Sequence, residues 1–111
     1  MSFRGWQARV QDILACCHNI QTFTAGMSYE IFMDDPKTIR AVAFELTTIG
    51  EAARAIPTEI QEKYSKIPWG KIQGIRNVLV HEYFRLDEEI LWKTIQENIP
   101  ELIILLDQIS K

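Results

Sequence analysis

The sequence predicts an all-α fold, a bundle of four to five helices. Two long segments carry apolar residues at alternating spacings of three and four, which is the spacing of one helix face. Residues that typically start and stop helices separate the segments. Nowhere does the sequence show the alternating pattern of a β-strand. With 111 residues, of which 47% are hydrophobic, we expect one domain, residues 1–111.

The first long helix is expected to begin after Ser2, a good N-cap, and to end at Gly26. Glycine readily adopts the left-handed conformation that often follows a helix. His18 lies off the apolar face, so we expect it at the surface and assign it no role. The apolar face consists of Phe3, Trp6, Val10, Ile13, Cys17 and Ile20.

A short helical turn is expected from Ser28, and the second long helix follows it to about residue 55. Asp35 is a good N-cap for this helix, and Pro36 suits its first position. Two long helices with matching apolar faces predict an antiparallel pair. The face of the second helix consists of Ile39, Val42, Leu46, Ile49, Ala53 and Ile56.

Three shorter helical segments are expected to complete the bundle. Thr58 and Gln61 form a capping-box pattern that opens a short helix. Pro68 opens the next helix, which runs to about residue 85. The last helix begins near Asp87 with an apolar face of Ile90, Leu91, Trp92, Ile95 and Ile99, and Pro100 either kinks it or starts a new helix.

Residues 102–106 are all aliphatic, so apolar side chains would point in almost every direction around this helix. A helix of this kind buries more than one side. In so small a chain the second side is expected to meet a partner chain, so we predict a homodimer.

The composition excludes some kinds of protein. The formal net charge of −3 argues against a general duplex-DNA-binding protein with a basic face. The charge is nevertheless uneven: residues 62–85 carry five basic and two acidic side chains, whereas residues 86–111 carry two basic and six acidic ones. A chance fluctuation would explain this distribution equally well.

The cysteines and apolar runs predict a cytoplasmic protein without membrane contact. Cys16 and Cys17 are adjacent, and the geometry of an ordinary disulfide does not fit such a pair. A reducing cytosol is therefore the simplest compartment. We find no signal-peptide pattern, and residues 102–106 are too short a run to span a bilayer.

Residues 74–84 concentrate polar chemistry beside an apolar face. On a regular helix Asn77 and His81 lie one above the other, and Arg76 and Tyr83 share a face. Arginine can hold a phosphate and stabilise developing charge, and histidine can move a proton near neutral pH. Asn77 can orient the imidazole or a phosphate oxygen. This set would suit metal-free RNA cleavage, in which the 2′-hydroxyl of the substrate attacks the adjacent phosphate.

Two interpretations of these residues remain open. Arg76 and His81 project about 140° apart on a regular helix, so a catalytic site would need both pairs from a dimer. Alternatively, Arg76 pairs with an acid such as Glu51, His81 caps or packs, and Tyr83 is a core aromatic. We expect no metal or cofactor, because the sequence has only two histidines, 63 positions apart, and no glycine-rich phosphate loop.

The spacing Arg76-x4-His81-x-Tyr83 resembles the RX4HXY signature of HepT-like toxins in the HEPN superfamily. The resemblance extends over most of the chain, about residues 3–109. It includes the segments 49–53, 56–57, 67–69, 74–77 and 81–84, together with Asp87, Trp92 and the region of Ile99 and Pro100.

This resemblance implies a dimeric all-α bundle of HEPN type with the motif helix at the dimer cleft. It implies a metal-independent endoribonuclease, the toxin of a type VII toxin–antitoxin pair. Arg76 and His81 match the catalytic residues, and Asn77 matches a supporting polar residue. Tyr83 matches the tyrosine that the antitoxin, a minimal nucleotidyltransferase called MntA, modifies with AMP.

The resemblance also implies an alternative. Some members of the superfamily are non-catalytic modules that dock or regulate a partner nucleotidyltransferase. An acid of the second long helix could support the site, with Glu45 and Glu51 as the candidates.

Overall fold

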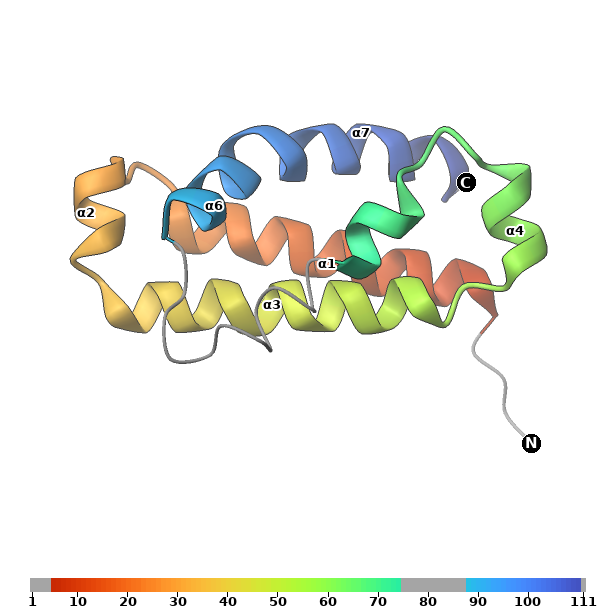
Figure 1. The fold of residues 1–111 in the computed structure, drawn as a ribbon, viewed down its shortest axis with the longest axis horizontal. Helices are drawn as coiled ribbons and strands as arrows, with labels where there is room; N and C mark the ends of the chain where they lie inside the picture. The colour runs from red at the N-terminus through yellow and green to blue at the C-terminus, as the bar shows by residue number, and fades with distance from the viewer. Residues whose placement is uncertain (1–4, 75–87, 111) are drawn as a thin grey trace.

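The computed structural model describes residues 5–74 and 88–110, and all regular structure in these ranges is helical (Figure 1). This confirms the predicted all-α bundle. The elements are α1 (Trp6–Thr24), α2 (Tyr29–Met33), α3 (Pro36–Arg54), α4 (Thr58–Lys63), a helical segment at 69–74, α6 (Glu88–Lys93), the π-helical turn η1 (Thr94–Asn98) and α7 (Ile99–Ile109).

The three long helices α1, α3 and α7 form the body of the bundle (Figure 1). Helix α1 runs antiparallel to α3, as predicted, and it packs against both α3 and α7. Helices α2 and α4 lie at opposite ends of the bundle. The helical segment at 69–74 lies on the flank of the bundle, and α6 leads into α7 on the same flank.

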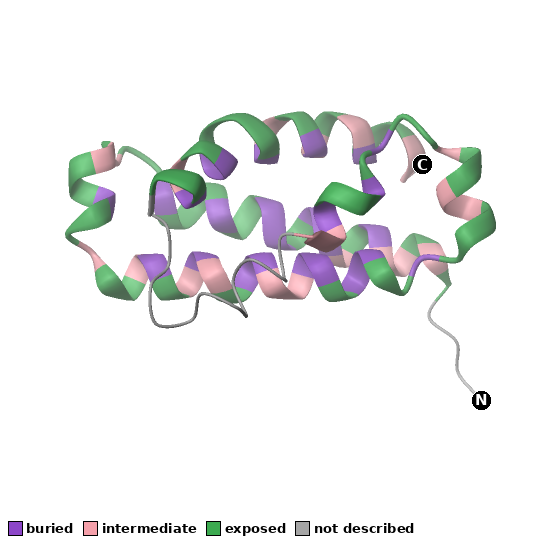
Figure 2. Ribbon diagram, in the orientation of Figure 1, coloured by how far each residue is buried: buried purple, intermediate pink, exposed green. Residues whose placement is uncertain are grey.

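One hydrophobic core joins these helices, and buried residues line their inner faces (Figure 2). All six apolar positions predicted for the second long helix are buried. In α1, Val10, Ile13, Cys17 and Ile20 are fully buried and Trp6 packs at the edge of the core, whereas Phe3 lies outside the described residues. The alternating spacing therefore identified the packed faces of both helices correctly.

The predicted capping residues are found at the starts of α2 and α3 and after the end of α1. The Ser28 hydroxyl accepts a hydrogen bond from the Ile31 amide at 3.2 Å. The Asp35 carboxylate accepts bonds from the Thr38 amide at 3.1 Å and the Thr38 hydroxyl at 2.7 Å. Gly26 follows α1 with a φ of 76°, in the left-handed region that glycine allows. Ser2 lies outside the described residues.

The predicted capping box at the start of α4 is wrong. Pro57 occupies the N-cap, and its carbonyl accepts the first helical bonds from Ile60 and Gln61, both at 3.0 Å. Thr58 is therefore already inside the helix and caps nothing. The Gln61 side chain instead donates to the Ile56 carbonyl at 2.9 Å.

Helix α7 directly follows the five-residue turn η1, and Pro100 is its second residue. Proline has no N–H to donate, so the regular ladder of helical hydrogen bonds is interrupted there. The wider π turn accommodates this interruption, and the chain stays helical from α6 to α7. The apolar face predicted for α6 is wrong at one position, because Ile90 is 50% exposed.

Within residues 5–74 and 88–110, we find no helix with the length and apolar content needed to cross a membrane.

The first prediction concerns the buried face of α3. Leu46 is fully buried, so Leu46→Ala should destabilise the fold by about 2–5 kcal/mol through lost burial and a residual cavity. Urea denaturation followed by circular dichroism measures this change. Lys37→Ala, on the exposed side of the same helix, should change the free energy of unfolding by less than about 0.5 kcal/mol. Equal effects of the two substitutions would contradict the packing described above.

Candidate active site

The predicted site residues Arg76, Asn77, His81 and Tyr83 lie outside the described residues, so their roles stay predictions. The structure describes what precedes and follows them. The chain enters residues 75–87 from the helical segment at 69–74 and returns from them at the start of α6. These two elements determine where the motif begins and ends.

The entering segment is fixed to the core by Trp69 and Ile72, which are 5% and 3% exposed. The indole N–H of Trp69 donates to the Tyr64 carbonyl at 3.1 Å. The Tyr64 ring in turn packs against the ring of Trp6 in α1, with centroids 5.8 Å apart. The described segment at 69–74, which leads into the motif, is therefore held in place by aromatic packing and a hydrogen bond.

The returning segment is fixed at the other end of the bundle by Leu91 and Trp92. Leu91 is buried, and the Trp92 ring packs against Phe32 with centroids 5.2 Å apart. The Trp92 ring also lies beside the ring of Tyr29, with centroids 6.2 Å apart. Because Tyr29 and Phe32 belong to α2, the short second helix serves to hold the chain that follows the motif.

The two acids considered as supporting residues occupy different environments on α3. Glu45 is only 8% exposed and accepts a hydrogen bond from the Asn19 side-chain amide of α1 at 2.8 Å. Its carboxylate therefore faces the α1–α3 seam. Glu51 is on the exposed side of the helix. A supporting role for either acid stays a prediction.

Glu45 also influences a neighbouring thiol. Burial raises the pKa of Cys16 to about 11, and the Glu45 carboxylate adds to the effect by charge and by hydrogen bonding. Burial likewise raises the pKa of Cys17 to about 12. Both thiols are free and buried in α1, so they are protonated and poorly nucleophilic near neutral pH.

Side chains that bind metals are dispersed over the part of the chain that the structure describes. No group of three His, Cys, Asp or Glu side chains in this part could hold a metal ion. His18 is exposed on α1, as the sequence predicted, one position from the buried Cys17.

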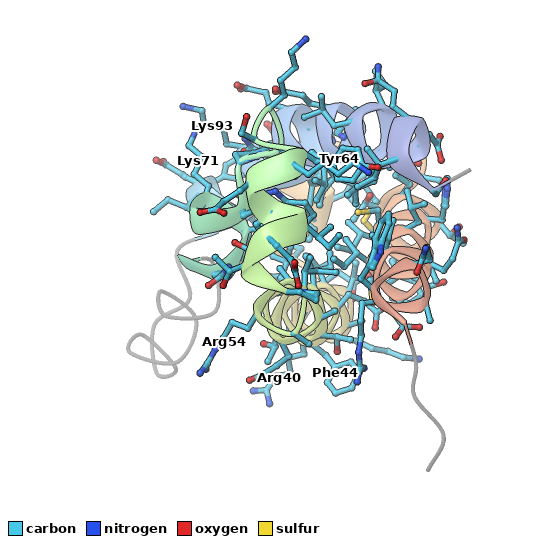
Figure 3. All side chains as sticks on the ribbon, turned by 90° about the vertical axis from the view of Figure 1, so that its right-hand side faces the viewer. Arg40, Phe44, Arg54, Tyr64, Lys71 and Lys93 are labelled. Atoms are coloured by element: carbon cyan, nitrogen blue, oxygen red, sulfur yellow. The ribbon has the colours of Figure 1, made fainter. Side chains whose placement is uncertain are left out.

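A cavity of about 490 Å³ lies between the segment at 69–74 and the helices α6, η1 and α7. Three lysines line it: Lys66, Lys71 and Lys93. Lys71 and Lys93 lie on the same side of the molecule (Figure 3). The remaining lining residues are Ile49, Pro68, Ile72, Ile90, Thr94, Asn98, Ile99, Glu101, Leu102 and Leu105.

Sequence reasoning missed part of this cavity. Lys66 and Lys71 belong to the basic segment at 62–85, but Lys93 lies in the acidic segment at 86–111. Counting charge along the chain therefore separates residues that the fold brings together. In the last helix, Lys93 and Asn98 stand as polar residues among apolar ones. This pattern does not reveal which other segment of the chain they lie beside.

Comparison with known proteins identifies the chain's relatives. The family model described as "Ribonuclease HepT-like" matches residues 13–109. A protein of Caldanaerobacter subterraneus subsp. tengcongensis, provisionally named an RNase, is 43% identical over 93 residues, covering 84% of this chain and 83% of its own. A protein of Thermococcus cleftensis, provisionally named ribonuclease HepT, is 39% identical, covering 89% and 90% of the two chains.

A third relative, from Methanocaldococcus jannaschii and also provisionally named an RNase, is 36% identical over 102 residues. The match covers 92% of this chain and 94% of the relative. No solved structure matches the chain significantly.

The second prediction concerns the reactivity of the two buried thiols. Because the thiolate is the reactive form, both cysteines should react slowly with a thiol-specific aromatic disulfide at pH 8. Reaction should accelerate as the pH rises towards about 11, where Cys16 ionises. Glu45→Gln removes a charge that opposes ionisation, so the pKa of Cys16 should fall and its reaction should speed up.

The single variants Cys16→Ser and Cys17→Ser assign the rates to each thiol. The reaction of Cys17 should change less than that of Cys16 in Glu45→Gln, because burial is the main cause of the raised pKa of Cys17 and Glu45 does not contribute to it directly. In guanidinium chloride both thiols should react quickly. Native thiols that react as fast as unfolded ones would contradict their burial.

Proposed function

Because the chain belongs to the HepT-like ribonuclease family of the HEPN superfamily, we propose that it is a metal-independent RNA endonuclease, the toxin of a type VII toxin–antitoxin pair. The observation that carries this proposal is the family match over residues 13–109, which spans the whole Arg76-x4-His81-x-Tyr83 signature. The proposal is supported by three relatives whose names contain the word RNase or ribonuclease.

The proposed reaction uses groups of the substrate and of the motif. The 2′-oxygen of the RNA forms a bond to the adjacent phosphorus while the bond from phosphorus to the 5′-oxygen breaks. The 2′-hydroxyl loses a proton and the leaving 5′-oxygen gains one, and the His81 side chains of the two protomers would divide these transfers, one as base and one as acid. Arg76 stabilises the extra negative charge on the phosphate oxygens. Asn77 orients the imidazole or a phosphate oxygen. The products are a 2′,3′-cyclic phosphate and a 5′-hydroxyl.

The proposed active site is shared by two copies of the chain. On a regular helix Arg76 and His81 diverge, so one copy alone makes an incomplete site. The exposed surface of α7 supports self-association, because Ile104 is 62% exposed while Ile103 is half-buried. A second protomer would remove such apolar surface from water.

The proposed regulation acts through Tyr83. A minimal nucleotidyltransferase of the MntA type would transfer AMP to the phenol oxygen, with pyrophosphate leaving from ATP. Because Tyr83 and Arg76 share one face of a regular helix, the added phosphate and adenine would occupy the basic cleft and exclude RNA. The ATP and its magnesium belong to the partner enzyme.

The third prediction tests catalysis. Purified wild-type protein should cleave RNA in the presence of EDTA and leave 2′,3′-cyclic phosphate ends. Arg76→Ala and His81→Ala should each lower the cleavage rate by at least about 100-fold, because each removes a group that acts in the transition state. Sedimentation should show that both variants remain dimers. Intact RNA with the wild-type protein, together with a stable complex with the nucleotidyltransferase, would favour the docking module instead.

The fourth prediction tests regulation. Co-expression with a minimal nucleotidyltransferase of the MntA type should add one or more AMP masses to the chain, localised to Tyr83 by peptide mass spectrometry. Tyr83→Phe keeps the aromatic ring but removes the acceptor oxygen, so its mass should stay unchanged and its RNA cleavage should escape neutralisation. An unmodified wild-type chain beside a demonstrably active partner would refute this regulation.

A further inference from the structure

We propose that the cavity beside the motif is an RNA subsite, in which the lysine rim holds a backbone phosphate and the apolar floor receives a base. This inference rests on the proposed ribonuclease function and extends it to residues outside the Arg–His motif. Measuring RNA binding and RNA cleavage separately distinguishes a failure of the subsite from a failure of the proposed ribonuclease function.

The rim of the cavity suits an anion. Lys66, Lys71 and Lys93 are all exposed, and among the described residues none of them forms an ion pair. One acid, Glu101, also lines the cavity, so its charged lining has three positive groups and one negative group. Unpaired ammonium groups around one hollow are a common arrangement for binding phosphate.

The floor of the cavity suits a flat apolar group. Ile72, Ile99 and Leu102 are buried in the core and form part of the lining. The volume of about 490 Å³ lies in the range of ordinary ligand pockets, roughly 300–1,000 Å³. A nucleotide combines the two chemistries that this lining offers, because its base has apolar faces and its phosphate carries negative charge.

The π-helical turn adds polar groups to the same wall. Thr94 and Asn98 mark the two ends of η1, and both line the cavity. The Thr94 hydroxyl is used within the helix, where it donates to the Ile90 carbonyl at 2.8 Å. The Asn98 amide is exposed and can exchange hydrogen bonds with a base edge or a sugar. Single π turns frequently occur at functional sites.

The position of the cavity links it to the predicted catalytic residues. One wall is the segment that leads into the motif, and the opposite wall begins where the chain returns from it. Lys71 is five positions before Arg76, so their Cα atoms can be at most roughly 17 Å apart. A single RNA strand can therefore contact both the cavity and Arg76.

Charge and shape together favour RNA over an acidic protein. Exposed lysines alone would attract either, but an acidic peptide has no flat base for the apolar floor. The carboxylate of Glu101 would form hydrogen bonds with a sugar hydroxyl or an exocyclic amine, whereas it would repel a run of acidic side chains.

The fifth prediction measures binding to a short single-stranded RNA by fluorescence anisotropy. All proteins carry His81→Ala, which prevents cleavage in the proposed mechanism. Lys71→Gln and Lys93→Gln should each raise Kd by about 3–10-fold near 150 mM salt. Each should also reduce the slope of log Kd against log salt by about 0.7, the value expected for one lost phosphate contact on a single strand.

Three variants serve as comparisons. Lys37→Gln, at the start of α3 and outside the cavity, should leave Kd within twofold of the His81→Ala parent. Glu101→Gln removes the negative charge that repels a phosphate, while its amide oxygen can still accept a hydrogen bond from a sugar hydroxyl or an exocyclic amine, so it should lower Kd. Leu105→Trp enlarges a lining side chain without changing the charge, so it should raise Kd by obstructing the floor. Thermal melting confirms that each variant is folded.

The outcomes separate the two proposals. If Lys71→Gln and Lys93→Gln change Kd no more than Lys37→Gln does, the subsite is refuted, even if the wild-type protein cleaves RNA. If the lysine variants weaken RNA binding but the wild-type protein cleaves nothing, the subsite stands and the proposed catalysis fails. Loss of binding to the nucleotidyltransferase without any change in RNA affinity would overturn the subsite in favour of a protein contact.

Discussion

The packing of α3 against α1 is the interaction on which the rest of this structure depends. The two 19-residue helices run antiparallel and bury their apolar faces against each other. The seam also contains the buried Glu45 carboxylate, which accepts a hydrogen bond from the Asn19 amide and interacts with the Cys16 thiol. A buried carboxylate needs a partner, so sliding one helix along the other would cost the energy of an unpaired acid. Hydrophobic burial stabilises the pair, and this contact defines its alignment.

This helix pair supports both ends of the segment that carries the motif. On one side, Trp6 of α1 packs against Tyr64, whose carbonyl accepts the hydrogen bond from Trp69. On the other side, α2 packs against α3 and presents Phe32 to the ring of Trp92. Helices α1 and α2 therefore hold the two described elements that flank the motif, the segment at 69–74 and α6. A core defect in the seam would reach the site through these aromatic contacts.

Sequence patterns predicted the main body of the fold because its forces are local or periodic. The spacing of Val42, Leu46 and Ile49 identified the buried face of α3, and Asp35 with Pro36 identified its start. The patterns failed where several local solutions compete. Pro57 took the capping position expected of Thr58, and Ile90 lies half exposed although its neighbours Leu91 and Trp92 pack inward.

The candidate site divides in the same way. The motif from Arg76 to Tyr83 is contiguous, so its chemistry could be proposed from the sequence alone, and it stays a prediction. The cavity is not contiguous, because its lysines come from the connection after α4, the segment at 69–74 and the end of α6. Only the path of the folded chain brings Lys71 and Lys93, which are 22 positions apart, to one hollow.

This arrangement gives a physical role to the acidic character of the chain as a whole. The formal net charge of −3 is unfavourable for a phosphate backbone, so we expect non-specific attachment of RNA to be weak. In the proposed subsite, the three lysines, which have no ion-pair partner among the described residues, attract the strand locally, within a Debye length of about 8 Å at physiological salt. A uniformly basic surface would bind RNA more tightly but in many orientations. In the proposed arrangement, the basic hollow beside the predicted motif places the bound strand where cleavage can occur.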